Sequence, residues 1–296
     1  MSLFEKYKQK SYSFFSSTVE KYLDHFENLR PTLKKAGINL DLREYLSITF
    51  MTILLTFIVE FPLLAFIIGF VPGFSVPMAF LLSFTISIFM SIGLFFFFYI
   101  YPNMKVDSRR KQIEYELPFA TIYMATISGG NTPPSVMFKI LSEFNQYPEL
   151  SKESQIVKRD IDLFGMDITE SIRKVASKTP SEDFKDLLWG LNTTINAGGS
   201  IQNYLHEKAK GYMDDYKRKL DQYSDTLSTL LEIYLTLIIV GSMFFIAMST
   251  MMSMFGLGEG IQGIILIAQA LVIFLFLPAV SIGFVYLLKS ISPRGG

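Results

Sequence analysis

The chain has 296 residues; half of them are hydrophobic and 28 are phenylalanine. Its 27 basic and 27 acidic residues give a formal net charge of zero. This balance argues against a nucleic-acid partner, because phosphates favour a strongly basic protein face. The chain contains no cysteine, which excludes disulfides, thiolate metal sites and cysteine nucleophiles.

Residues 1–45 are charged but patterned, and we expect a cytosolic amphipathic helical segment that lies near the membrane. The apolar side of its helix is formed by Phe15, Val19, Tyr22, Leu23 and Phe26. A second short element, residues 30–37, ends at a glycine. We interpret the segment as a packing helix with a basic flank; a specific lipid-binding device is the alternative.

Four windows are apolar for longer than the roughly 20 residues that a membrane-spanning helix needs. They are Leu46–Phe70, Val76–Tyr101, Ile233–Met254 and Gly263–Leu288. The sequence therefore predicts an all-α polytopic membrane protein with four transmembrane helices. These helices form two pairs, in residues 46–101 and 233–288.

The distribution of basic residues predicts the orientation. No lysine or arginine lies between Arg43 and Lys105, or between Lys219 and Lys289. Eight basic residues precede the first span, 17 lie between spans two and three, and two follow span four. Basic loops stay on the cytoplasmic side, so we expect both termini, including a tail of residues 289–296, and the middle segment to be cytoplasmic.

Span one contains the intramembrane carboxylate of Glu60, two residues before Pro62. An ionisable group at such depth is a functional candidate, although a structural role is the alternative. Glu60 is also the basis of an alternative function, a small transporter or channel. Spans rich in Phe, Leu and Ile, without polar stripes, disfavour that function.

Residues 102–232 predict a cytosolic bundle of six helices inserted between spans two and three. Pro102 should end span two and start a new helix. The helices are expected at 107–127, from Thr132 to before Tyr147, from Ser151 to Gly165, from the capping box at 167–170, from Thr179, and from Ser200. No proline follows Ser200 until Pro278, so the sixth helix should continue directly into span three.

Two glycine pairs, Gly129–Gly130 and Gly198–Gly199, are predicted to break helices. The segments around them, residues 125–131 and 194–200, resemble each other. They indicate an internal repeat of a helical hairpin, with chance as the competing explanation.

The residues that catalysis needs are missing. His25 and His206 are isolated, which disfavours a metal cluster or an acid–base pair. The Gly198–Gly199 pair lacks the lysine of a phosphate-binding loop. We therefore expect no enzymatic activity, no cofactor and no metal.

Two basic clusters are candidate contacts for an acidic protein surface or for anionic lipid headgroups. The first comprises Lys105, Arg109, Arg110 and Lys111; the second comprises Lys208, Lys210, Lys217, Arg218 and Lys219. The alternative is that both clusters only follow the bias of basic residues toward the cytoplasm.

The order of the elements resembles the type II secretion system F domain family. The residues that carry the likeness are Glu116-Leu117-Pro118-Phe119, Ser128-Gly129-Gly130, Gly165-Met166-Asp167, Thr179-Pro180, Ala197-Gly198-Gly199-Ser200-Ile201 and Tyr204-Leu205. They look most similar to the tight-adherence and archaeal branch. Longer members carry two copies of the cytosolic domain, whereas this chain has one.

The resemblance implies a non-enzymatic scaffold in the cytoplasmic membrane, the platform of a type IV pilus, archaellum or secretion machine. Such a platform would hold pilin or archaellin-like subunits in the lipid bilayer above a hexameric secretion ATPase. It would act as a homodimer or beside a paralogue. The sixth helix would be a lever, and Glu60 would attract a charged pilin N-terminus.

Overall fold

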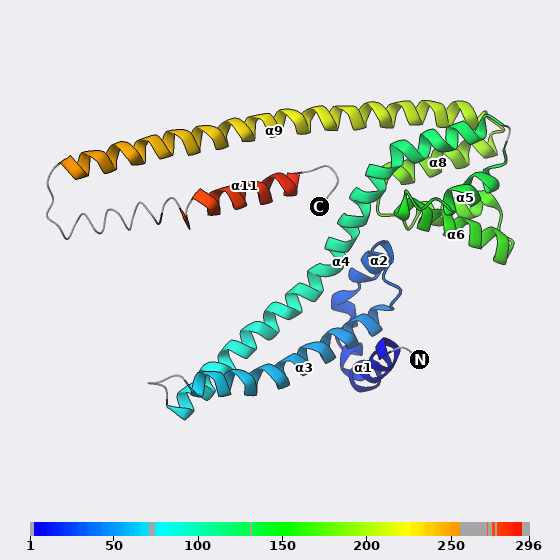
Figure 1. The fold of residues 1–296 in the computed structure, drawn as a ribbon. Coiled ribbons are helices and arrows are strands. Elements are labelled where there is room, and N and C mark those ends of the chain that lie inside the picture. The colour runs from blue at the N-terminus through cyan, green and yellow to red at the C-terminus, as the bar shows by residue number, and fades with distance from the viewer. Residues whose placement is uncertain are drawn as a thin grey trace. The chain divides into compact units, whose positions relative to one another are not determined.

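The computed structural model describes residues 3–70, 75–130, 132–254, 271, 274–275 and 277–291 (Figure 1). All regular elements in these ranges are helical, which confirms the all-α prediction for them. By its internal contacts the chain divides into two compact units. Unit 1 comprises residues 1–111 and 170–189, and unit 2 comprises residues 112–169 and 190–296.

Unit 1 begins with α1 (Leu3–Glu20), a 3-10 turn η1 (Leu23–Phe26) and α2 (Leu29–Lys35). These elements pack on the start of α3 (Leu42–Gly69). The buried core there consists of Val19, Leu29, Leu33, Leu42, Tyr45 and Leu46. The predicted apolar side was wrong at Tyr22, which is 51% exposed, because α1 ends at Glu20 and the tighter 3-10 turn changes the periodicity.

The two helices of the first predicted pair of spans, α3 and the first half of α4 (Val76–Ser128), lie side by side within unit 1. The rings of Phe57 and Phe61 each contact the ring of Phe84 edge to face. The centroid distances to Phe84 are 6.1 Å from Phe57 and 5.9 Å from Phe61. On α4 the small residues Ala79, Ser83 and Ser87 are buried. Small side chains allow helix backbones to approach closely in a membrane.

The predicted helix break at Pro102 was wrong, because α4 continues through it for 53 residues. Proline lacks the amide that would bond to the carbonyl of Phe98, four residues earlier. That carbonyl instead accepts a hydrogen bond of 2.7 Å from the Tyr45 hydroxyl of α3. A side chain distant in sequence therefore satisfies the group that the proline leaves open.

Removing this donor in Tyr45→Phe should destabilise the protein by about 1–3 kcal/mol, because the Phe98 carbonyl loses its partner. Adding Pro102→Ala should restore most of the loss, since the new amide can bond to the same carbonyl. Thermal unfolding of the purified protein measures both effects. Tyr22→Phe is the matched control, and equal losses in the single and the double variant would contradict the explanation.

Five helices follow α4 within residues 132–254. They are α5 (Pro134–Ser142), α6 (Pro148–Phe164), α7 (Ile168–Ala176), α8 (Glu182–Asn196) and α9 (Ile201–Met254). The predicted start of the last helix is confirmed, because the Asn203 amide donates to the Ser200 side chain at 3.3 Å. Its predicted continuity is confirmed as well, since α9 runs unbroken for 54 residues.

Two predicted helix starts were wrong. Helix α6 begins at Pro148 rather than at Ser151, whose hydroxyl instead donates to the Ser142 carbonyl at 2.7 Å. The cap of α8 is Ser181 rather than Thr179, because the Phe184 amide donates to the Ser181 hydroxyl at 3.3 Å. Serine and threonine both cap helices well, so local preference does not choose between such neighbouring candidates.

The two glycine pairs end their helices differently. Gly198 has a φ of 64°, the left-handed conformation expected after α8. Among the described residues the other glycines with positive φ are Gly37 and Gly165, so Gly129 and Gly130 end α4 without it. The internal repeat stays a prediction.

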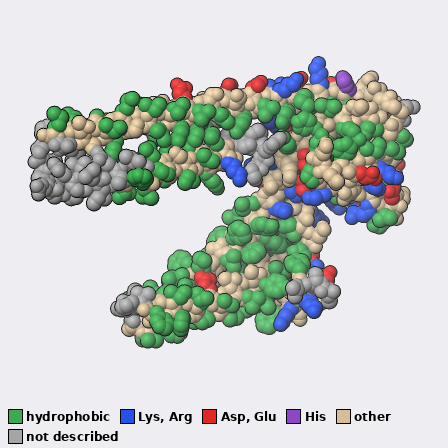
Figure 2. Space-filling view, viewed as in Figure 1, with side chains coloured by type: hydrophobic (Ala, Val, Ile, Leu, Met, Phe, Trp, Pro, Cys, Tyr) green, Lys and Arg blue, Asp and Glu red, His purple; other side chains and the backbone are tan. Residues whose placement is uncertain are grey.

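In the described part of the chain three helices are long and apolar enough to cross a membrane: α3, α4 and α9. Figure 2 shows hydrophobic side chains covering much of them. The first part of the fourth predicted span, Gly263–Leu288, lies outside the described residues, and the described end of this span belongs to α11 (Leu277–Ile291). Within unit 2, α11 packs on α9, since the rings of Tyr234 and Phe284 stack at 4.2 Å.

Candidate interaction surfaces

The end of α4 and the start of α9 pack together within unit 2. The ring of Tyr216 on α9 lies 5.2 Å from that of Phe119 and 6.0 Å from that of Tyr115, both on α4. Near the end of α4, a side chain at Gly129 would meet the amide nitrogen of Gln202 at 3.2 Å. The glycine thus lets the end of α4 approach α9 closely.

A groove of about 540 Å³ lies between these two helices. Its lining consists of Ile122, Ala125, Thr126, Gln202, His206, Ala209, Lys210, Met213, Asp214 and Lys217. Buried Ala125 and Ala209 line it, and Ile122 is 40% exposed. The groove therefore combines apolar walls with two lysines from the second basic cluster.

The other members of the second cluster do not line this groove. Arg218 pairs with Asp215 three residues earlier on α9, and both side chains are largely exposed. Lys219 is exposed and Lys208 is half-buried. The structure therefore groups Lys210 with Lys217 and separates them from the rest of the predicted cluster.

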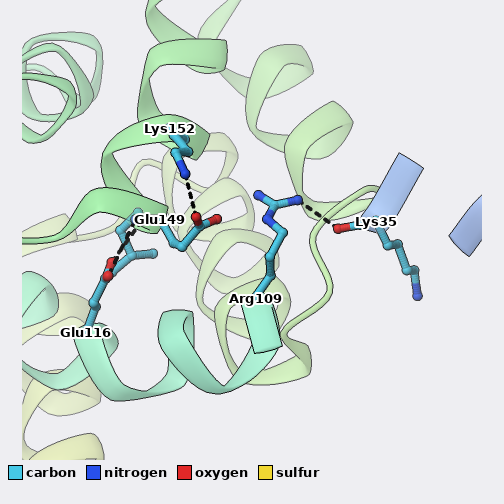
Figure 3. Close-up of polar contacts among 6 residues, drawn as sticks. Lys35, Arg109, Glu116, Glu149 and Lys152 are labelled. Carbon is cyan, nitrogen blue, oxygen red and sulfur yellow. Dashed lines mark hydrogen bonds and ion pairs between the residues drawn. The ribbon is translucent and has the colours of Figure 1, made fainter. Parts of the chain in front are cut away.

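In the first cluster, Arg109 has a structural contact within unit 1. Its guanidinium donates a hydrogen bond of 2.7 Å to the Lys35 carbonyl at the C-terminus of α2 (Figure 3). It also lies so close to Gly37 that a Cβ there would meet it at 2.9 Å. A cation at this position satisfies the open carbonyls of a helix end.

The rest of the first cluster is open to solvent. Arg110 and Lys111 pair with Asp107 at 2.7 and 3.4 Å. These are exposed pairs on one helix face, and such pairs contribute little to stability. Lys105 is also exposed, so three of the four predicted residues remain accessible.

Glu116 of α4 is a structural site whose role the sequence did not predict. Its carboxylate accepts hydrogen bonds from the backbone amides of Glu149 and Leu150, at 3.4 and 3.0 Å (Figure 3). It therefore caps the start of α6, where helix amides have no partner within the helix. The neighbouring Glu149 side chain pairs with Lys152 at 2.6 Å.

Burial raises the pKa of the Glu116 carboxyl, and the nearby charge of Glu149 raises it further. The two backbone amides and Lys152 act in the opposite direction, but burial is the largest effect. A clue was present in the sequence, since Glu116 falls three residues after Ile113 and four before Ala120, on one apolar face of the helix. The partner amides, 33 and 34 residues away, gave no such signal.

Glu60 is half-buried on α3. It forms no hydrogen bond or ion pair with the other residues that the structure describes. In the same ranges no group of three or more histidine, aspartate or glutamate residues could hold a metal ion. The role of Glu60 therefore stays a hypothesis.

Residues 120–249 match the sequence model of the family described as type II secretion system (T2SS), protein F. We call this matched segment the protein F domain. It begins four residues after Glu116 and includes α5–α8, the groove and most of α9. Together with the long apolar helices α3, α4 and α9 in the described part of the chain, this match supports a multi-pass protein of the inner membrane.

The chain is also similar to archaeal proteins. Flagella accessory protein J of Methanocaldococcus jannaschii is 28% identical over 137 residues, 46% of this chain and 24% of the relative. The protein of the same name from Methanococcus voltae is 23% identical over 145 residues, 49% of this chain and 26% of the relative.

An uncharacterised M. jannaschii protein is 27% identical over 135 residues, which are 46% of this chain and 23% of that protein. The chain thus matches about a quarter of the length of each of these relatives. No solved structure matches the chain significantly.

Proposed function

We propose that this chain is a non-enzymatic platform protein in the cytoplasmic membrane of a type IV pilus-like, archaellum or secretion machine. In this role it couples a cytosolic hexameric ATPase to the insertion or extraction of pilin or archaellin-like subunits. Both termini and the protein F domain face the cytoplasm, as the distribution of basic residues predicts. The platform works as a homodimer or beside a paralogue.

The observation that carries the proposal is the continuity of α9. Its 54 residues run without a break from the protein F domain into an apolar span. At 1.5 Å per residue this helix is about 80 Å long. A partner that tilts or rotates the domain would therefore move the membrane segment as well, because no loop separates them.

The proposal is tested by deleting the chain from its own cell and by purifying the tagged protein. Without it, filaments should be absent from the cell surface while the ATPase still hydrolyses ATP. The ATPase should co-purify with the tagged protein. Normal filament number after deletion, or selective ion flux in vesicles that Glu60→Gln abolishes, would favour the transporter alternative instead.

Reversing the charges in the groove with Lys210→Glu and Lys217→Glu should weaken ATPase binding by about tenfold at low salt, because charge pairs guide such contacts. Binding is measured by titration at several salt concentrations. Lys139→Glu with Lys178→Glu makes the same change in net charge at exposed positions outside the groove. If both pairs weaken binding equally, only net charge matters and the groove is not the contact.

A further inference from the structure

One flank of α1 combines lysines with an exposed aromatic ring. Lys6, Lys10 and Phe14 follow one another at four-residue steps, and Lys21, directly after the helix, comes seven residues after Phe14. Side chains at these spacings project to the same side of a helix. All four residues are exposed, and Phe14 is 69% exposed.

The opposite flank of α1 has a different character. It carries Glu5, Gln9, Ser16 and Glu20, which also fall at spacings of four and seven. This side therefore holds acidic and neutral polar groups without a lysine, together with the ring of Tyr12, which is 41% exposed. A helix with one basic flank and one acidic flank is suited to lie between a membrane surface and water.

The contacts of α1 with α3 determine where the helix lies. The Tyr7 hydroxyl bonds to the Thr52 hydroxyl at 2.9 Å, and the ring of Phe15 stacks on Phe50 at 6.2 Å. Thr52 and Phe50 both lie in the apolar part of α3, the first predicted span.

Charged contacts hold α1 to the polar start of the same helix. Lys8 pairs with Glu44 at 2.9 Å, and Glu20 pairs with Arg43 at 3.4 Å. The contacts thus reach from the charged end of α3 to its apolar turns. Helix α1 therefore lies beside the boundary between the polar start of α3 and its apolar turns.

We propose that α1 is an interfacial helix whose flank of Lys6, Lys10, Phe14 and Lys21 lies on anionic lipid headgroups. The ring of Phe14 enters the boundary of the acyl chains, while the lysine stems extend along the surface and their amines reach the headgroup phosphates. The acidic flank faces water. This lipid contact of α1 requires neither the ATPase nor the filament.

A fluorescence experiment tests the proposal, because the chain has a single tryptophan. In a Trp189→Phe background, Phe14→Trp places a probe on the lysine flank, and Gln9→Trp places the matched control on the acidic flank. Each full-length protein is reconstituted in nanodiscs of phosphatidylglycerol and phosphatidylcholine with brominated acyl chains. Bromine should quench the probe at position 14 by about twofold or more, with a blue-shifted emission, and leave the control near its unquenched level.

Equal quenching at positions 14 and 9, or none at position 14, would overturn the proposed orientation of α1. A second variant tests the charge of the lipid. Combining Lys6→Gln, Lys10→Gln and Lys21→Gln with the position 14 probe should remove the difference in quenching between discs with and without phosphatidylglycerol. If quenching does not depend on phosphatidylglycerol, or the triple change leaves the dependence intact, these lysines do not recognise anionic headgroups.

Discussion

Replacing Gln222 with proline should abolish filament assembly while the protein still reaches the membrane and the ATPase still hydrolyses ATP. Residue 222 lies in the exposed part of α9, between the aromatic contact of Tyr216 with α4 and the apolar span. A proline inside a helix costs about 3 kcal/mol or more and kinks it, because it removes one hydrogen bond and clashes with the preceding turn.

The matched control is Gln222→Ala, which changes the same exposed side chain but preserves the helix. Counting filaments on cells that carry each variant, with membrane levels measured in parallel, checks the prediction. The proline variant should form filaments at less than about a tenth of the control level, since a kink of this cost shifts an equilibrium by more than tenfold. Equal filament numbers would show that α9 does not transmit force as a continuous rod.

Glu116→Ala should open the start of α6 by removing the cap on two buried amides. The expected loss is about 2–4 kcal/mol, because each amide is left without an acceptor away from water. Hydrogen exchange of the Glu149 and Leu150 amides measures it directly. Their protection should fall by roughly 30- to 1,000-fold, since every 1.4 kcal/mol corresponds to a factor of ten.

Gln112→Ala is the control for this change, because it alters an exposed residue one turn earlier on α4. Its amide protection at Glu149 and Leu150 should match that of the wild type. Unchanged protection in Glu116→Ala would mean that these amides are satisfied by another group.

The raised pKa of Glu116 also predicts how stability changes with pH. A carboxyl whose pKa is higher in the folded state binds its proton more readily there, so its contribution falls as pH rises through the folded pKa. Lowering the pH from neutral toward the usual carboxyl range should therefore stabilise the α4–α6 contact. In Glu116→Gln this part of the pH dependence should disappear; an unchanged profile would assign it to Glu149 or another group.

Local signals in the sequence were sufficient for several helix boundaries. The cap at Ser200 and the left-handed turn at Gly198 involve residues within a few positions of each other, so the chain itself carries the information. The long apolar stretches of α3, α4 and α9 were recognisable in the same way, because a span depends on composition over a single segment.

Features that depend on distant residues could not be read from the sequence. The continuation of α4 through Pro102 needs the Tyr45 hydroxyl, which stands 57 positions earlier. The cap that Glu116 provides lies on another helix. The sequence also could not divide the basic clusters into structural and accessible residues. Packing gives Arg109 a structural contact and places Lys210 and Lys217 in the lining of a groove.

The distance between residues 207 and 229 tests most directly whether the protein F domain and the span move as one piece. The chain has no cysteine, so Glu207→Cys with Thr229→Cys attaches one spin label to each end of this part of α9. In an unbroken helix the two Cα atoms lie about 33 Å apart. A single narrow distance near this value, unchanged when the ATPase binds with or without nucleotide, is the predicted result. A broad or shortened distribution in either state would show that α9 bends between the domain and the membrane, which contradicts the lever.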